Sequence, residues 1–494
     1  MGRRVLPRQI AKNGNNAMNV LILGAGQVGR TVLESLAADF NMNVTMVDID
    51  PHALTEVRAM HSCSTVLGHA SSPDVLREAG IDDCDAIVAV TASDEVNLVA
   101  CQVALTLHDT PMRIARIRNL AYLGDQHAEL FSTGGIPVDE PISPELTVVN
   151  HLRNLVEYQG AVYIAEFADA QVIMTCTRMQ PESELLGLPA VEFAKANGNR
   201  AHLVGLLRDN KVVQSLGDAT IADGDLAFIL GQKHAMQELS RDLSGIFKPY
   251  RQIVIGGGGH IGMRLAKDVH ELSPRRNIKI IEADPARAEQ LAGELASSVD
   301  LTVLSGDASS EDFLRANDVN DSDLYCAVTN NDLVNVVSSL TAKRLNVRTV
   351  FTLVQRVNYL ESLVQAGIEI PISPQQTTAN IIQRLVREKT LSVFRHLALF
   401  NLDLIELRVQ GNAETSRVVG KRPSHLKLPK GTHLLCVIRG ANTESGGEPL
   451  EIYPIHADPD VRLEEGDRAV FITEGSEATT KAEQLFRAKA FKLF

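Results

Sequence analysis

The 494-residue sequence contains no tryptophan, and aromatic residues make up only 4% of it. Proteins that bind single-stranded nucleic acid stack the bases on aromatic side chains, so this scarcity argues against such a partner. Acidic residues outnumber basic ones by 61 to 48, which gives a formal net charge of −13. This charge disfavours a phosphate backbone or an anionic membrane surface as a direct partner. We therefore expect neither nucleic-acid binding nor direct membrane insertion.

Cysteine is also scarce, and the 6 cysteines form no C-x-x-C pair and show no histidine spacing that suits zinc. We expect no metal site, and we expect reduced, buried thiols in a cytoplasmic protein. No apolar run is long enough to span a bilayer. Residues 1–17 are basic without an apolar core, so they are predicted to form a disordered leader and not a signal peptide. The cysteines are Cys63, Cys84, Cys101, Cys176, Cys326 and Cys436.

A glycine motif of the form G-x-G-x-x-G occurs twice, each time after a short apolar run and before a segment with helical periodicity. This order is typical of a dinucleotide-binding turn. The first glycine permits the tight turn, the second lets the backbone approach a pyrophosphate, and the third lets the helix pack close to its strand. Backbone N–H groups and the positive end of the helix dipole then face the phosphates. The predicted binding residues are Gly24, Ala25, Gly26, Gln27, Val28 and Gly29 in the first copy and Gly257, Gly258, Gly259, His260, Ile261 and Gly262 in the second.

The two motifs open two long segments that repeat each other. In 18–150 and again in 250–390, short apolar runs alternate with helical patterns, which predicts a parallel, doubly wound α/β sheet in each. The sequence Pro-Ile-Ser-Pro at 141–144 recurs unchanged at 371–374. At one constant offset, Thr91, Asp94 and Asn97 match Thr329, Asp332 and Asn335. The chain is therefore predicted to contain a duplicated Rossmann-like domain.

Each Rossmann-like segment is followed by a smaller segment with a different pattern. Residues 161–231 and 402–474 are rich in β-branched residues, contain glycine and aspartate turns and show little helical periodicity. Each is predicted to be a small β-rich α+β domain. The predicted organisation is a leader (1–17), a Rossmann-like domain (18–150), a β-rich domain (151–240), a second Rossmann-like domain (250–390), a second β-rich domain (395–478) and a terminal tail with a short helix (479–494).

An acidic residue follows each glycine motif at the end of the predicted second strand. These residues are Asp48 and Glu282. A carboxylate there accepts hydrogen bonds from both ribose hydroxyls and repels a 2′-phosphate, which favours NAD, ADP or ATP over NADP. The alternative is that both acids are solvated loop residues or helix N-terminal charges. Asp50 and Asp284, each just before a proline, are predicted to be helix N-caps.

Thr91 and Thr329 end the predicted fourth strands, beside the same crevice. Their hydroxyls are placed either to contact a ligand or to cap the next helix, and Asp94 and Asp332 are also placed to cap it.

Arg113, Arg116 and Arg118 form a tight cluster near the first glycine motif. In a strand Arg116 and Arg118 point to one face, where they would meet phosphates or a neighbouring subunit, whereas a surface salt bridge is the alternative. The second copy has Leu353 and Gln355 at the matching positions. The two sites are therefore expected to differ, the first carrying more positive charge for a polyphosphate.

The sequence shows no His/Asp or Tyr/Lys arrangement that suggests hydride transfer, and His260 in the second loop is assigned no catalytic role. Both segments after the Rossmann-like copies are also small for a substrate domain. Binding without turnover is therefore favoured, and no catalytic residue is predicted. An NAD-dependent oxidoreductase with duplicated cofactor domains is the main alternative.

These motifs together resemble the TrkA family, the peripheral subunits of bacterial Trk potassium uptake, which are built from RCK domains (regulators of potassium conductance). The resemblance covers the chain from Met18 nearly to its end. It rests on 23–29, 47–48, 77–80, 89–97 and 113–118 in the first half, on 306–309, 327–330 and 372–376 in the second, and on 416–420 in the last segment.

The resemblance implies a cytosolic ring, a homotetramer, docked beneath a TrkH-type potassium channel subunit on the cytoplasmic face of the inner membrane. It implies that NAD(H), ATP and ADP bind the Rossmann-like domains and gate the partner by changing the shape of the ring. A free-standing nucleotide sensor acting on another transporter is a further alternative. By position, the first site would use 24–28, Asp48, Thr91 and Arg116, and the second would use 257–261, Glu282 and Thr329. Leu353 departs from the pattern of the first site, so equal affinity is not expected.

Overall fold

A computed structural model describes residues 17–37, 42–132, 134–244, 249–295, 301–356, 359–368, 370–387, 391–440 and 450–488 of the chain. Of the predicted leader only Ala17 is described, and the last six residues of the predicted tail also lie outside the described ranges. The helix predicted for the tail is α14 (Ser476–Phe486), which begins three residues before the predicted start of the tail at residue 479.

The first half contains a 6-stranded parallel sheet with the strand order β3-β2-β1-β4-β5-β6. In the central strand β1, Ile22 and Leu23 are fully buried, because helices cover both faces of a doubly wound sheet. The strands are β1 (Met18–Leu23), β2 (Met42–Asp48), β3 (Ser64–Leu67), β4 (Ala86–Ala89), β5 (Met112–Arg116) and β6 (Glu140–Ile142). The helices are α1 (Gln27–Ala37), α2 (Pro51–Met60), α3 (Pro73–Glu78), α4 (Asp94–His108) and α5 (Pro144–Glu157).

The second half repeats this sheet with the order β14-β13-β12-β15-β16-β17. Position by position this is the order of the first sheet, which confirms the predicted duplication and the doubly wound α/β class. The strands are β12 (Gln252–Gly256), β13 (Asn277–Glu282), β14 (Leu301–Ser305), β15 (Leu324–Ala327), β16 (Thr349–Leu353) and β17 (Ile370–Ile372). The helices are α8 (His260–Leu272), α9 (Pro285–Leu295), α10 (Glu311–Ala316), α11 (Asp332–Arg344), α12 (Leu360–Gln365) and α13 (Pro374–Val386).

Each half then continues into a 5-stranded antiparallel sheet, as the β-rich pattern predicted. The first, ordered β10-β9-β11-β8-β7, contains β7 (Ala161–Phe167), β8 (Val172–Arg178), β9 (Ala201–Arg208), β10 (Lys211–Val212) and β11 (Leu226–Gln232), with helices α6 (Phe193–Ala196) and α7 (Lys233–Ser244). The second, ordered β18-β19-β22-β20-β21, contains β18 (Leu391–Leu397), β19 (Leu402–Arg408), β20 (Thr432–Arg439), β21 (Glu451–Pro454) and β22 (Arg468–Thr473). This sheet starts at Leu391, earlier than the β-rich pattern, which began at Leu402. Polar residues such as Arg395 interrupt the apolar pattern of its first strand.

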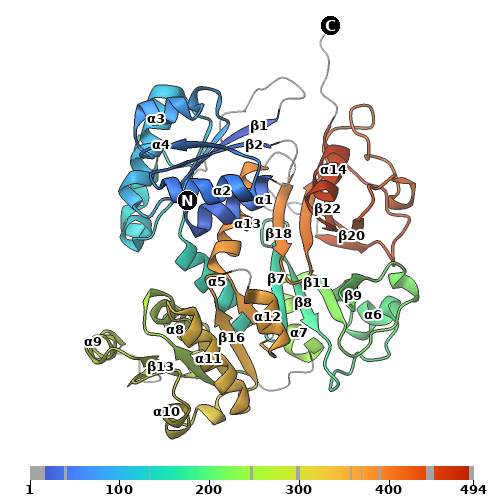
Figure 1. Cartoon of the computed structure of the whole chain (residues 1–494). Coiled ribbons are helices and arrows are strands. Elements are labelled where there is room, and N and C mark those ends of the chain that lie inside the picture. The colour runs from blue at the N-terminus through green and yellow to red at the C-terminus, as the bar shows by residue number, and fades with distance from the viewer. Residues whose placement is uncertain are drawn as a thin grey trace.

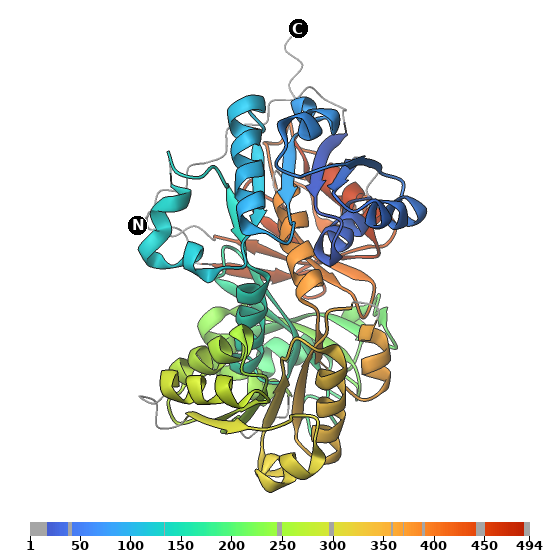
Figure 2. The same ribbon diagram turned by 60° about the vertical axis from the view of Figure 1, so that its left-hand side comes forward.

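The two halves exchange a helix. α5 leaves the first parallel sheet and packs against α8 of the second half, while α13 leaves the second sheet and packs against α1 of the first half (Figure 1). Ile382 and Leu385 of α13 accordingly belong to the same apolar cluster as Val32 and Leu36 of α1. α5 and α13 also pack against each other between the two parallel sheets (Figure 2). The exchange joins the halves through their cores and not only through the connecting chain.

The two antiparallel sheets also meet, and buried charges cross their contact. Glu406 is fully buried, and its carboxylate accepts hydrogen bonds from the Ala168 backbone at 2.8 Å and from the Arg468 guanidinium at 3.0 Å. Arg468 also pairs with Asp169 of the first antiparallel sheet at 2.5 Å. A buried carboxylate is stable only when its oxygens are paired in this way. The cluster therefore fixes how the two sheets sit together.

Candidate functional site

The first crevice opens at the carboxyl end of β1, where the glycine turn leads into α1. Gly24 has a φ of +108°, which favours glycine, and its N–H donates to Val47 O at 2.8 Å. A Cβ on Gly29 would lie 1.9 Å from Gly24 O, so the helix can approach the turn only without a side chain there. Gly26 is exposed, and a Cβ on it would meet nothing within 4 Å. The middle glycine is therefore not required by the fold.

Asp48, at the end of β2, holds this turn in place. Its Oδ2 accepts from the Ala25 N–H at 2.5 Å, and its Oδ1 accepts from the Asp50 N–H at 2.8 Å. A carboxylate oxygen has two lone pairs, so each oxygen retains one acceptor position. Neither sequence interpretation anticipated this bracing role, which is compatible with ribose binding. Asp50 caps α2 as predicted, accepting from the His52 N–H at 2.8 Å.

The second crevice repeats the arrangement with a longer acid. Glu282 accepts from the Gly258 N–H at 3.0 Å and from the Asp284 N–H at 2.9 Å, and Asp284 makes the predicted cap contact with the Ala286 N–H at 2.8 Å. The second residue of this turn lies closer to neighbouring side chains than Ala25 of the first turn does. A Cβ on Gly258 would lie 2.4 Å from Leu291 Cδ1, whereas the first turn accommodates the methyl group of Ala25.

A hydrogen-bond network ties the tip of the fourth strand to the tip of the fifth. The N–H and the hydroxyl of Thr91 both donate to Asn97 Oδ1, at 2.9 and 2.7 Å, and Asn97 Nδ2 donates to Arg116 O at 3.0 Å. In the second half, Thr329, Asn335 and Leu353 O form the same network. The constant offset between the two threonine–asparagine pairs was the only sequence signal for it. Each threonine hydroxyl therefore already has a protein partner.

Asp94 and Asp332 are not the caps that the sequence suggested. The capping side chains belong to the preceding residues, Ser93 and Asn331. Asp94, the first residue of α4, instead accepts from the Arg118 N–H at 2.9 Å, and Asp332 accepts from the Gln355 N–H at 2.8 Å. Their carboxylates extend sideways to the chain leaving the fifth strand, and this contact is not visible in a local sequence pattern.

The arginine cluster divides into three different environments. Arg113 makes a salt bridge with Asp139 at 2.7 Å, the alternative weighed from the sequence, whereas Arg118 has an exposed side chain. Arg116 is half-buried, and its Nε is buried without a hydrogen-bond partner among the described residues. Burial, followed by repulsion from Arg118, lowers the pKa of Arg116, while Glu145 and Asp94 act in the opposite direction. The matching Leu353 is 2% exposed, so only the first crevice has a cation at this position.

Hydrogen bonds between three glutamines connect the first glycine turn to the segment that follows β16 in the second half. Gln375, 4% exposed in the first turn of α13, donates from Nε2 to Gln27 Oε1 at 3.1 Å and to Gln355 Oε1 at 2.6 Å. The helix exchange makes this contact possible, because α13 carries Gln375 to the start of α1. The side chain of His260, which matches Gln27, is exposed. Gln375 therefore brings the first glycine turn into direct contact with the second half of the chain.

Other chemistry is limited in the part of the chain that the structure describes. No group of three or more metal-ligating side chains occurs there. No helix in these ranges has the length and apolar content needed to cross a bilayer. The six cysteines are free thiols, and burial raises the pKa of Cys101 to about 12. Cys63, which is only partly buried, also has a raised pKa because of burial.

Two doubly wound sheets with matching glycine turns, each followed by an antiparallel sheet, define a tandem of Rossmann-like domains of the RCK type. The family model of the TrkA-N domain matches residues 20–144 and 253–374, the two parallel-sheet segments. The Trk system potassium uptake protein TrkA of Vibrio alginolyticus is 35% identical over 479 residues, covering 96% of this chain and 100% of the relative. The TrkA protein of Haemophilus influenzae is 35% identical over 480 residues, with the same two coverages. The chain therefore belongs to the TrkA family.

Solved structures share the fold at lower sequence identity. The crystal structure of the GsuK RCK domain aligns with a TM-score of 0.58 and 19% identity, covering 97% of this chain and 96% of that one. The GsuK channel bound to NAD aligns with a TM-score of 0.58 and 18% identity, covering 98% of this chain and 81% of that one. The tandem arrangement of the four sheets is thus shared along nearly the whole chain.

Proposed function

We propose that this chain is the regulatory subunit of a potassium uptake system, and that it binds NAD(H), ATP or ADP in both crevices without converting them. The proposal for the first crevice assigns the phosphates to 24–29 and Arg116, and the ribose to Asp48, with Thr91 at the rim. In the second crevice 257–262, Glu282 and Thr329 take the same places. Membership of the TrkA family supports the role in potassium uptake.

The observation that carries the nucleotide proposal is the state of Arg116. A half-buried guanidinium with an unpaired Nε is unfavourable by itself, because burial without a partner costs more than a hydrogen bond returns. A nucleotide phosphate that extends from the glycine turn across the tip of β4 to β5 would supply the missing acceptors, and Arg is well suited to bind phosphate in this way. The GsuK channel, which shares the fold, has been solved with NAD, and this supports including NAD(H) among the ligands to be tested.

Exposed apolar helix faces support the proposed assembly into a homotetrameric ring. Val99 is 49% exposed and Leu107 56% exposed on α4, and Leu333 is 70% exposed and Val337 38% exposed on α11. Val99 and Val337 occupy the same position in the two halves. Such patches favour burial in an interface. Packing α4 of one copy against α11 of the next would be a head-to-tail contact, which produces a closed ring when the rotation closes.

The proposed partner is a TrkH-type channel subunit, beneath which the ring would sit on the cytoplasmic face of the membrane. A nucleotide can shift the ring between two shapes only by the ratio of its affinities for them. The direct test is potassium flux into vesicles carrying the reconstituted partner, with and without this chain, under ATP, ADP and NADH in turn. We expect flux to depend on the chain and on the nucleotide. Equal flux under all three nucleotides and without nucleotide would refute the gating role.

Binding without turnover is tested on the same preparation. NADH and ATP should be recovered unchanged after long incubation with the chain, whereas efficient consumption of either would contradict the proposal. The assembly is tested by mass photometry of the wild type and of a Val99→Asp, Val337→Asp double variant. We expect a tetramer that dissociates in the variant, and a monomeric wild type would exclude the ring.

A further inference from the structure

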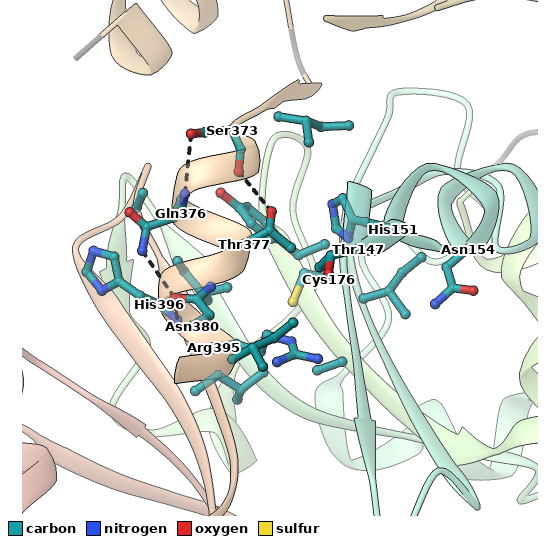
Figure 3. A pocket seen from close by; sticks show the side chains of 18 of the residues that line it. Thr147, His151, Asn154, Cys176, Ser373, Gln376, Thr377, Asn380, Arg395 and His396 are labelled. Carbon is teal, nitrogen blue, oxygen red and sulfur yellow. Dashed lines mark hydrogen bonds between the residues drawn. The ribbon is translucent and has the colours of Figure 1, made fainter. Parts of the chain in front are cut away.

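A polar cavity of about 300 Å³ lies between the exchanged helices α5 and α13 and the edge strands β7 and β18 (Figure 3). No residue of either glycine turn lines it. Thr147 and Asn150 of α5 face it from the first half, and Thr377 and Asn380 of α13 face it from the second. Each pair stands three and six residues after the first proline of its helix, so the frame of the cavity follows the internal duplication. A ligand in it would touch both halves of the chain.

Two side chains break this symmetry. Arg395 lines the cavity from β18, two residues before the end of the strand, where β7 has Ala165. His151 lines it from α5, where α13 has Ile381. Burial, and the nearby Arg395, lower the pKa of His151 to about 4, so its imidazole is neutral at pH 7. The frame is therefore duplicated, whereas the cation is present only once.

Arg395 is held in the cavity without a neutralising contact. Its Nη1 donates to the Phe394 carbonyl at 3.1 Å, and no carboxylate of the described residues forms an ion pair with it. His396, its neighbour, has its own carboxylate, Asp403, at 2.7 Å. Burial lowers the pKa of Arg395 and Arg384 acts in the same direction, whereas Glu166, which also lines the cavity, acts against both. Glu166 thus acts on the guanidinium through space and leaves its donors available.

The remaining polar groups supply donors to the same space. Asn380, which lines the cavity, accepts at Oδ1 from Gln376 Nε2 at 3.1 Å (Figure 3) and from the His396 N–H at 3.4 Å, and its amide nitrogen is a hydrogen-bond donor. The hydroxyls of Thr147 and Thr377 donate to carbonyls of their own helices, each at 2.8 Å. A guanidinium, a side-chain amide and a neutral imidazole form a donor set for an oxyanion. At roughly 30 Å³ for each water molecule, the volume corresponds to about ten waters and accommodates a small metabolite.

We propose that this cavity binds a small organic oxyanion, a phosphate- or carboxylate-bearing metabolite, with Arg395 as its charge partner and Asn380 and His151 as hydrogen-bond donors. The ligand bridges α5 and β7 of one half to α13 and β18 of the other. Its occupancy therefore stabilises one relative placement of the two halves. The site is separate from the nucleotide crevices and does not depend on their proposed role.

The test is a titration of the full chain with inorganic phosphate and, separately, with succinate, at constant ionic strength set with sodium chloride. The midpoint of thermal unfolding and the heat of binding are recorded with the nucleotide crevices saturated by ADP and again without ADP. We expect a saturable rise of the midpoint with at least one anion, and the anion that produces it identifies the phosphate or the carboxylate class. No rise beyond the chloride control, meaning a cavity that holds only water, would overturn the proposal.

Variants separate this cavity from the other phosphate-binding surfaces. Arg395→Gln should weaken anion binding at least tenfold, and Arg408→Gln, which changes an exposed arginine of the adjacent strand β19, should leave it unchanged. Glu166→Gln removes a carboxylate that lines the cavity and would repel a bound anion, so this variant should strengthen binding. This variant keeps the proposal testable if Arg395→Gln does not fold. Equal affinity in wild type, Arg395→Gln and Glu166→Gln would place the bound anion elsewhere. Because the signal is also measured without ADP, failure of nucleotide binding does not remove it.

Discussion

Replacing Arg116 with glutamine should weaken binding of ATP more than binding of ADP, while leaving the fold intact. Arg116 ends β5, which is separated from β1 and its glycine turn by β4, and its half-buried guanidinium has an Nε that is unpaired among the described residues. A hydrogen bond to a charged group contributes roughly 1.5–3 kcal/mol, which corresponds to about a 10- to 150-fold change in affinity. We expect a loss in this range for ATP, whose terminal phosphate adds charge, and a smaller loss for ADP.

The stability of the variant provides an independent check. Burial lowers the pKa of Arg116, which means that its charged form is held at a free-energy cost when no anion is bound. The backbone carbonyl, which accepts from Asn97, is kept in the variant. The thermal midpoint of the unliganded variant should therefore equal or exceed that of the wild type. A residue present only for structure would give the opposite sign.

Isothermal titration calorimetry with ATP and ADP, on wild type, Arg116→Gln and Arg118→Gln, completes the experiment. Arg118 has an exposed side chain and is the matched control, expected to change either affinity only slightly. Unchanged ATP and ADP affinities in Arg116→Gln, with binding retained, would refute the reasoning. Equal losses for both nucleotides would show that Arg116 does not discriminate between them.

Three further predictions concern the crevice and the core. Asp48→Asn should weaken nucleotide binding at the first crevice by roughly 1–3 kcal/mol in calorimetry. Asp50→Asn preserves the helix cap and should leave the affinity unchanged. Equal affinities of wild type and Asp48→Asn would contradict the role assigned to Asp48. Gly26→Ala should fold normally and lose nucleotide affinity, because a Cβ on Gly26 meets nothing within 4 Å. Gly29→Ala should lower the thermal midpoint, because a Cβ on Gly29 would lie 1.9 Å from Gly24 O. An unchanged midpoint in Gly29→Ala would show that the turn can open. When the pH falls from 7 to 5, the unfolding free energy of the wild type, measured by urea titration, should fall by roughly 1–2 kcal/mol more than that of His151→Gln. The reason is that the unfolded chain binds a proton at His151 below about pH 6.5, whereas the folded chain binds it only near its pKa of about 4. Parallel pH profiles of the two proteins would refute this prediction.

Much of the fold could be predicted because the strand–turn–helix units are local. Apolar runs, glycine spacing and capping residues such as Asp50 and Asp284 determine each unit within a few residues of sequence. The repeat of these units then predicted a duplicated doubly wound domain, and the two sheets have the same strand order. The binding roles of the glycine turns and of Asp48 stay predictions, although the turns adopt the backbone geometry expected of them.

Features that depend on contacts between distant segments could not be predicted. The apolar face of α13 indicates that the helix is buried, but it does not indicate that its partner is α1 of the other half. Asp94 has the sequence context of a cap and is used instead to hold the chain after β5. The cavity around Arg395 combines α5 and β7 of the first half with α13 and β18 of the second, and no pattern in any one of these elements signals it.

The helix exchange has a consequence for how the two crevices can differ. Two separate half-length chains that traded helices would form a symmetric dimer, and both crevices would then carry the same residues. Here a single polypeptide contains both partners of the trade, so Arg116 and its counterpart Leu353 are free to vary independently. Every copy of the chain therefore brings one crevice with an arginine at this position and one without it, and this one-to-one ratio does not depend on protein concentration.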